Sequence, residues 1–142
     1  MLKNAVKGRV NIVENVNDWK EAITLAAKPL VEDGRVENSY IDAMIANVNT
    51  FGTYIVIAPK VAMPHSRPED GVNKNCVSLL KVNEGVLFEG EEEKVYVFFV
   101  LGAVNSDSHI ETLMELMELI EDEEKIDEII EAGNVQEIMD LI

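Results

Sequence analysis

The chain is 142 residues long, the size of one domain, and its 27 acidic and 12 basic residues give a formal net charge of −15 at pH 7. This balance excludes a nucleic-acid backbone as partner, because proteins that bind one need basic patches, whereas acidic runs such as 89–93 and 111–131 are usually solvated faces. The single cysteine, Cys76, excludes an internal disulfide and a multi-cysteine zinc site, as suits a reducing compartment.

A short strand over 9–14 opens the predicted fold, and a helix follows it. Asp18 and Glu21 have the spacing of a capping box, and the residues after them form an apolar stripe at helical spacing. Pro29 lacks the N–H group that a helix interior uses, so we expect the helix to kink or to stop early there.

A second helix is predicted from Ser39, because Ser39 and Asp42 also have capping spacing and precede another apolar stripe. Residues 54–58 then read as a buried strand. The proline-rich loop that follows this strand contains one of the only two histidines of the chain.

Two further strands are predicted in the middle of the chain. Residues 76–82 form the first, and 86–88 extend it after a short turn at 83–85. Residues 95–101 form the most apolar strand, which is typical of a central strand covered by helices on both faces. The apolar stretch around it is only half a membrane span, and the N-terminus lacks the apolar core of a signal peptide. We therefore expect a cytoplasmic protein without membrane insertion.

Two capping pairs predict the last helices. Ser108 with Glu111 opens one helix, and Asn134 with Glu137 opens the other. Together the elements predict one α/β domain over 1–142. It is a sandwich with a mixed, mostly parallel sheet of about five strands and helices on both faces.

His65 is the first candidate for chemistry. Pro64 and Pro68 restrict the backbone on either side of it, so the histidine should stand on a stiff turn. An imidazole is largely neutral at cellular pH, and one ring nitrogen is then free to attack. Arg67 adds a guanidinium that suits an oxyanion such as phosphate. An isolated loop histidine is more often merely exposed or capping, and the flanking residues decide between the two interpretations.

The segment from Ala58 to Val72 resembles the phosphohistidine segment of enzyme IIA components of the bacterial phosphoenolpyruvate:sugar phosphotransferase system, mannitol/fructose class. The ascorbate-type branch fits best. The likeness extends from about residue 9 to 142 and is carried by the runs Phe51-Gly52-Thr53-Tyr54, Ala62-Met63-Pro64-His65, Arg67-Pro68-Glu69-Asp70-Gly71-Val72 and Asp107-Ser108-His109. Lys60 departs from the pattern, since relatives usually carry glycine there.

The resemblance implies a phosphocarrier that needs no cofactor. His65 would accept a phosphoryl group from the histidine-containing phosphocarrier protein and pass it to a cysteine of a separate enzyme IIB, which serves the membrane permease enzyme IIC. The sugar would never touch this chain. Such a transfer needs positioning and charge stabilisation more than acid–base chemistry.

His109 is the second candidate, because the capping pair places it in the first turn of a helix, where free N–H groups favour an anion. It could equally cap or pack, but the resemblance implies a second active-site histidine that stabilises the phosphoryl group. The N–H groups of Ser108 and its neighbours would help it.

A docking surface is predicted around the loop. An apolar rim would meet the partners, and acidic side chains would meet basic residues on them. The rim residues are Val61, Met63 and Val72, and the acidic residues are Glu69 and Asp70.

Four alternatives stay open at this point. His65 and His109 could bind a metal with Asp70 or Asp107, but the spacing matches no ligand pattern and Arg67 would repel a cation. Cys76 could accept a phosphoryl group, but it begins an apolar strand without a basic neighbourhood. A hydrolase with His65 as base has no evident partner residue. A regulatory module of the same fold, acting on a transcription factor, kinase or transporter, is the strongest of the four.

Overall fold

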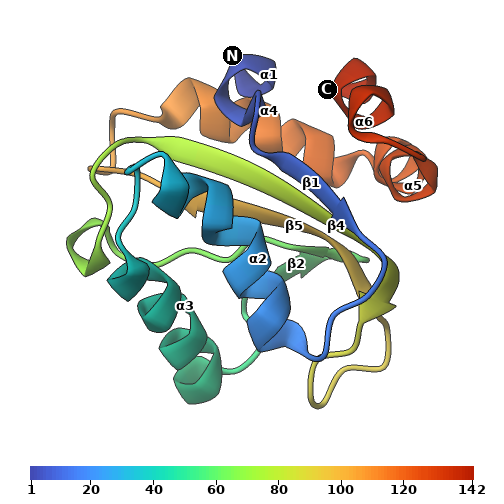
Figure 1. Ribbon diagram of the computed structural model, residues 1–142, viewed down its shortest axis with the longest axis horizontal. Helices are drawn as coiled ribbons and strands as arrows, with labels where there is room; N and C mark the ends of the chain where they lie inside the picture. Colours follow the sequence, from blue (N-terminus) through green and yellow to red (C-terminus); the bar gives the residue numbers. More distant parts are fainter.

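A five-stranded sheet runs through the middle of the computed structural model, which describes residues 1–142 (Figure 1). Its strands lie in the order β1 (Val10–Val13), β4 (Cys76–Val86), β5 (Val95–Gly102), β3 (Val61–Ala62) and β2 (Val56–Ala58). The β1–β4 and β3–β5 pairs are parallel, whereas the β4–β5 and β2–β3 pairs are antiparallel. The sheet is therefore mixed, and β5 is its central strand, as predicted.

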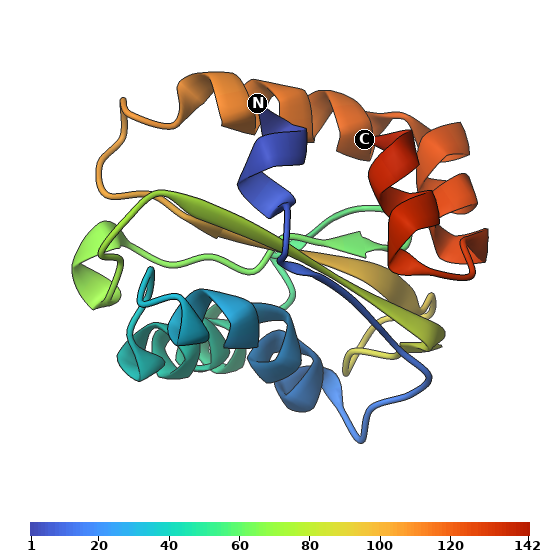
Figure 2. The same ribbon diagram turned by 45° about the horizontal axis from the view of Figure 1, so that its top comes forward.

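Helices cover both faces of the sheet (Figure 2). One face carries α2 (Trp19–Glu32) and α3 (Asn38–Phe51), and the other carries α1 (Leu2–Val6), α4 (Ile110–Glu121), α5 (Glu123–Glu131) and α6 (Val135–Leu141). Side chains of β5 alternate between two cores: Phe98 and Val100 pack with α2 and α3, while Val97 and Phe99 pack with the other helices. This arrangement confirms the predicted α/β sandwich. No helix has both the length and the apolar content needed to cross a membrane.

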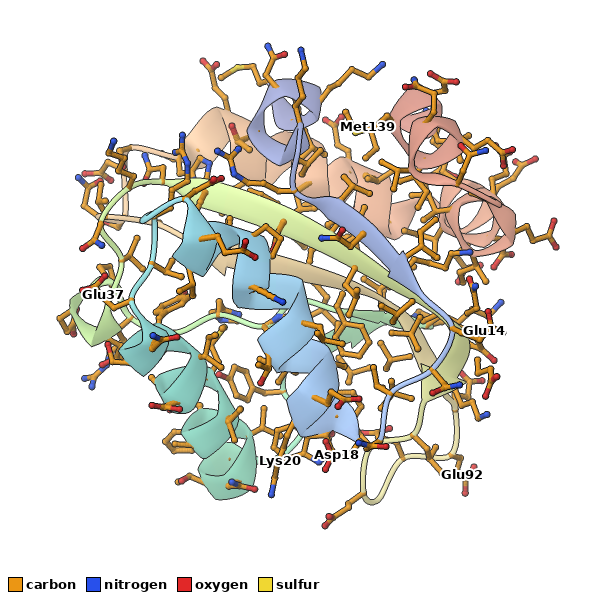
Figure 3. The ribbon with its side chains drawn as sticks, viewed as in Figure 1. Glu14, Asp18, Lys20, Glu37, Glu92 and Met139 are labelled. Carbon is orange, nitrogen blue, oxygen red and sulfur yellow. The ribbon has the colours of Figure 1, made fainter.

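Acidic side chains lie mainly on the outside of this framework. Glu14, Glu37 and Glu92 lie on three different connections at the edge of the molecule (Figure 3). Residues 121–125 are all exposed. The acidic residues are therefore solvated, which keeps their mutual repulsion low.

The helix predicted after Asp18 is longer than expected. Asp18 caps it as predicted, because its carboxylate accepts the N–H of Glu21 at 2.9 Å. The helix nevertheless continues through Pro29 to Glu32, so the expected early stop is wrong. Pro29 lies in the last turn, and the fully buried Leu30 packs that turn into the core, which outweighs one missing hydrogen bond.

Two other capping predictions are wrong. The α3 helix begins at Asn38 and the α4 helix at Ile110, and neither has a side-chain cap. The Ser39 hydroxyl donates instead to the carbonyl of Asp70, at 3.1 Å. The Ser108 hydroxyl bonds to the Asn75 side chain. Both serines tie distant loops together, and His109 becomes the residue before α4, outside its first turn.

The strands also differ in detail from the prediction. The turn expected at 83–85 is an irregular part of the continuous strand β4, where the register with β5 shifts between Lys81 and Val86. Residues 56–58 form the half-buried edge strand β2, so the expected buried strand over 54–58 is wrong. The elements α1, β3 and α5 were not predicted.

Candidate functional site

The His65 loop leaves the sheet beside the end of the central strand. Strand β3 pairs in parallel with β5, and the N–H of Leu101 donates to the carbonyl of Pro64 at 3.1 Å. On the other side, the N–H of Met63 donates to the carbonyl of Ile55 at 2.8 Å. The backbone just before His65 is thus hydrogen-bonded on both sides, which fixes the position of the His65 Cα, to which the side chain is attached.

One ring nitrogen of His65 is hydrogen-bonded to the backbone two residues earlier. Nδ1 lies 2.7 Å from the carbonyl oxygen of Met63. A carbonyl oxygen only accepts hydrogen bonds, so Nδ1 carries the proton and Nε2 keeps a free lone pair. The residue is half-buried, and the ring of Tyr54 meets the imidazole edge-on, with 5.6 Å between ring centroids. In the neutral ring, Nε2 is therefore the nitrogen with the free lone pair.

A polar network holds the residue after His65. The N–H of Ser66 donates to the Tyr40 hydroxyl at 2.9 Å, and the Ser66 hydroxyl accepts from the Asn47 amide at 2.9 Å. The same Ser66 hydroxyl donates to the Asp70 carboxylate. This bond, and next the Arg67 guanidinium, hold the pKa of Asp70 below its ordinary value. Asp70 is thus an ionised acceptor that shapes the loop.

Arg67 lies on the surface of the loop. Its side chain is 76 % exposed, and its Nε lies 3.6 Å from Glu69 and 3.7 Å from Asp70. Exposed ion pairs of this kind contribute little to stability. The guanidinium is therefore held loosely beside two carboxylates and is able to turn toward an anion at low cost.

His109 immediately precedes α4, with its Nδ1 buried and without a hydrogen-bond partner. Burial lowers the pKa of His109, and the nearby Gly102 carbonyl partly opposes this shift. Gly102 follows Leu101, the residue that bonds to Pro64. Consecutive residues at the end of β5 therefore contact the His65 loop and the His109 side chain.

The loop before His109 is fixed by asparagine side chains. Asn75 accepts the N–H of Val104 at 2.9 Å and donates to the Ser108 hydroxyl at 3.0 Å. Asn105 accepts the N–H of Ser108 at 2.8 Å. The Ser108 N–H is thus already used, so its predicted contribution to phosphoryl binding needs correction. The first N–H groups of α4 have no side-chain cap and are free donors.

The predicted docking residues divide into two groups. Val61 and Met63 are 0 % and 9 % exposed, because β3 is inserted beside β5, so they cannot form an apolar rim. Val72 is half-buried, Glu69 is exposed and Asp70 belongs to the loop network. Two exposed apolar side chains adjoin the histidines: Tyr54, whose ring packs against His65, is 40 % exposed, and Ile110, the residue after His109, is 49 % exposed.

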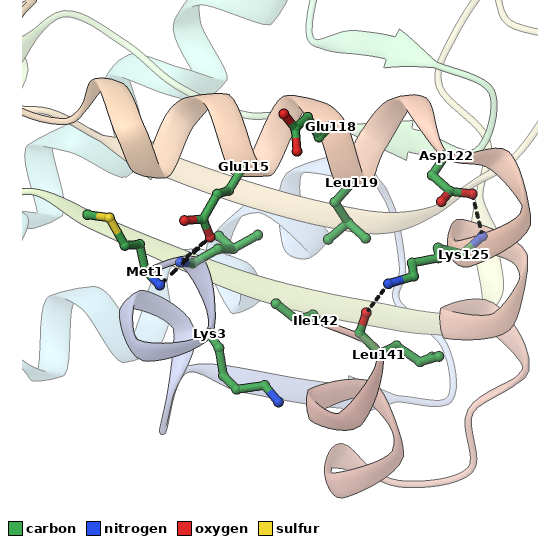
Figure 4. Close-up of a pocket in the computed structure, with 10 residues that line it drawn as sticks. Met1, Lys3, Glu115, Glu118, Leu119, Asp122, Lys125, Leu141 and Ile142 are labelled. Atoms are coloured by element: carbon green, nitrogen blue, oxygen red, sulfur yellow. Dashed lines mark hydrogen bonds and ion pairs between the residues drawn. The ribbon is translucent and has the colours of Figure 1, made fainter.

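The remaining candidates lie away from this chemistry. Cys76 is buried, and burial raises the pKa of its thiol to about 11, which keeps it protonated and unreactive. No three His, Cys, Asp or Glu side chains are placed to hold a metal ion. A pocket of about 350 Å³ lies between α1, α4 and α6, where Glu115 accepts the N–H of Leu2, but no predicted site residue lines it (Figure 4).

Sequence reasoning missed three residues of the site: Tyr40, Asn47 and Tyr54. Tyr40 and Asn47 both lie on α3, Tyr40 on its buried side and Asn47 on its more polar side. From the sequence this helix is predicted only to contribute apolar side chains to the core. Tyr54 belongs to a run that was noted for its likeness alone. No local signal shows that a hydroxyl will reach a loop elsewhere in the chain.

Comparison with known proteins agrees with this geometry. Residues 5–142 match the family model for the phosphoenolpyruvate-dependent sugar phosphotransferase system, EIIA 2. The ascorbate-specific PTS system EIIA component of Salmonella choleraesuis is 35 % identical over 140 residues, which is 97 % of this chain and 91 % of that protein.

Solved structures give the same result. The mannitol-specific cryptic phosphotransferase enzyme IIA of Escherichia coli superimposes with a TM-score of 0.92 at 31 % identity, covering 99 % of this chain and 96 % of that one. The mannitol enzyme IIA of Escherichia coli, solved in complex with phosphorylated enzyme IIB, gives a TM-score of 0.78 at 28 % identity and covers 94 % of this chain and 92 % of that one. The chain therefore belongs to the EIIA 2 family of the phosphoenolpyruvate-dependent sugar phosphotransferase system.

Proposed function

We propose that Nε2 of His65 accepts a phosphoryl group from the phosphorylated histidine-containing phosphocarrier protein and passes it to a cysteine thiolate of a separate enzyme IIB. In the first step the donor P–N bond breaks as the P–Nε2 bond forms, and the donor imidazole keeps the electron pair. In the second step the P–Nε2 bond breaks as a P–S bond forms. The observation that carries the proposal is the bond from Nδ1 to Met63, which leaves Nε2 unprotonated.

Charge on the phosphoryl group would be stabilised from two sides. The free N–H groups at the start of α4, beside His109, favour an anion, and the segment after β5 leads directly to them. Arg67 would turn from Glu69 and Asp70 toward the phosphoryl oxygens. A loose transition state needs this positioning of charge and no general acid or base.

An enzyme IIB partner has direct support, because the related mannitol enzyme IIA is described in complex with phosphorylated enzyme IIB. The phosphocarrier protein and, indirectly, the permease enzyme IIC complete the proposed chain of partners. Tyr54 and Ile110 offer exposed apolar contacts near the histidines, and Glu69 adds a negative charge for a basic partner. These residues replace Val61 and Met63 as the proposed docking surface.

The cargo of the system would be a sugar or a sugar acid similar to ascorbate, since one relative is named ascorbate-specific and another mannitol-specific. The regulatory alternative is not favoured, because relatives at 31–35 % identity are named as sugar phosphotransferase components. One sheet joins both cores, which supports treating residues 1–142 as one domain. The proposed transfer would take place in the bacterial cytoplasm.

A reconstituted assay tests the proposal. The protein is incubated with labelled phosphoenolpyruvate, enzyme I and the phosphocarrier protein, and the phosphorylated peptide is mapped under alkaline conditions. Wild type should carry an acid-labile label, which then moves to an added enzyme IIB. His65→Ala should carry none, whereas Cys76→Ala should be labelled normally. A label that persists in His65→Ala would overturn the assignment.

A further inference from the structure

The peptide group that joins His65 to Ser66 is held at both of its polar atoms by tyrosine hydroxyls. Tyr54 donates to the carbonyl oxygen of His65 at 3.3 Å, and Tyr40 accepts the N–H of Ser66 at 2.9 Å. We propose that Tyr40 and Tyr54 form a clamp that orients the His65 imidazole, and that both are positioning residues for phosphoryl transfer. The inference rests on the proposed function, whose acceptor is His65.

Tyr40 supplies the rigid side of the clamp. It is fully buried, and its hydroxyl donates to the carbonyl of Leu101 at 2.6 Å. A hydroxyl has one proton, and the short bond to Leu101 uses it, so the lone pairs face the N–H of Ser66. Burial raises the pKa of Tyr40, which keeps this donor protonated. One atom thus joins α3, the His65 loop and the end of β5.

Tyr54 supplies the surface side. Its ring lies almost perpendicular to the imidazole, at 80°, with the centroids 5.6 Å apart. The preceding residue, Thr53, donates to the carboxylate of Glu91, which ties this segment to the loop before β5. Tyr54 is also 40 % exposed, so it is both a wall for the ring and reachable by a docked protein.

The clamp matters because the imidazole has little else to hold it. Only the Nδ1 bond to Met63 fixes the ring itself, and that bond depends on the backbone angles around His65. Release of the His65–Ser66 peptide would let the Cα of His65 shift, and Nε2 would move with it. A misplacement of about 1 Å costs on the order of 100-fold in rate.

Single-turnover transfer from the phosphorylated phosphocarrier protein tests the clamp. Tyr40→Phe should lower the maximal transfer rate by about 10- to 100-fold and leave the half-saturating donor concentration unchanged. Tyr54→Phe keeps the ring and loses a long hydrogen bond, so its effect should be smaller, and Tyr54→Ala should be slower than Tyr54→Phe. Tyr96→Phe is the matched control, because Tyr96 lies near the start of β5, at the opposite end from Leu101, with its ring against Gly85.

A nitrogen NMR spectrum of the His65 ring supplies a readout that a general loss of stability would not change. Tyr40→Phe and Tyr54→Ala should reduce the share of the tautomer protonated at Nδ1, at a temperature where each variant is folded. Wild-type rates and an unchanged tautomer in both variants would overturn the clamp. If Tyr40→Phe does not fold, the Tyr54 variants still test the clamp, because Tyr54 is exposed and its substitution should leave the fold intact. Failure of wild type to be labelled at His65 would instead overturn the proposed function.

Discussion

Nδ1 of His65 and the carbonyl oxygen of Met63 are 2.7 Å apart, so the backbone of the loop favours the neutral tautomer whose free lone pair lies on Nε2. We predict that the phosphoryl group sits on Nε2. Proton–nitrogen correlation spectra should show the Nδ1-protonated tautomer in the free protein and phosphorus coupling to Nε2 after labelling. Coupling to Nδ1 would show that the loop rearranges before it accepts the group.

His109 should assist transfer without being modified. Its side chain lies at the start of α4, near the backbone of Gly102 at the end of β5. His109→Ala should still be labelled at His65, but transfer to and from partners should slow by about 10- to 1,000-fold, the usual cost of losing one preorganised donor. Thermal unfolding by circular dichroism is the control, and unchanged rates would leave His109 a structural residue.

His109 should also make stability depend on pH. Burial lowers its pKa in the folded state, so between that value and the ordinary value of 6.5 the unfolded chain binds more protons than the folded one. The free energy of unfolding therefore falls as the pH drops through this window. Urea denaturation should show a steeper loss on acidification for wild type than for His109→Gln. Parallel curves would contradict the burial of the imidazole.

The sequence predicts the parts of this molecule that depend on neighbours in the chain. The apolar run 95–101 identifies the central strand, and prolines around His65 identify its loop. The capping predictions at Ser39 and Ser108 fail because each hydroxyl bonds to a residue more than 30 positions away. Tyr40 reaches Ser66 across 26 positions and Leu101 across 61. Such contacts form only after the sheet brings the loops together, so the pattern of neighbouring residues in the sequence does not predict them.

Arg67 should act on phosphoryl charge more than on folding. Arg67→Lys keeps the charge but loses the planar fork, so it should fold normally and transfer more slowly, and Arg67→Ala should be slower still. The competing explanation is that Arg67 shapes the loop through Glu69 and Asp70. The double variant Glu69→Gln, Asp70→Asn is the comparison. Equal losses of activity and of melting temperature in it and in Arg67→Ala would favour loop shaping.

Lys60 provides a test of backbone strain next to the site. It is the one non-glycine residue with a positive φ, at 71°, and its carbonyl accepts the N–H groups of Tyr96 and Val97, which align β3 with β5. Its amino group lies 2.9 Å from the Asp127 carboxylate on α5, and both side chains are substantially exposed. Glycine would adopt this backbone conformation without strain, whereas the Cβ of Lys60 disfavours it.

Three variants separate the strain from the ion pair. Lys60→Gly and Lys60→Ala both lose the bond to Asp127, but only glycine removes the Cβ that a left-handed residue disfavours. Lys60→Gly should therefore melt roughly 2–8 °C higher than Lys60→Ala. Asp127→Asn should melt close to wild type, because an exposed pair contributes little. Equal melting temperatures for the glycine and alanine variants would mean that the turn relaxes freely, and Lys60 would then place no constraint on the strand that leads to His65.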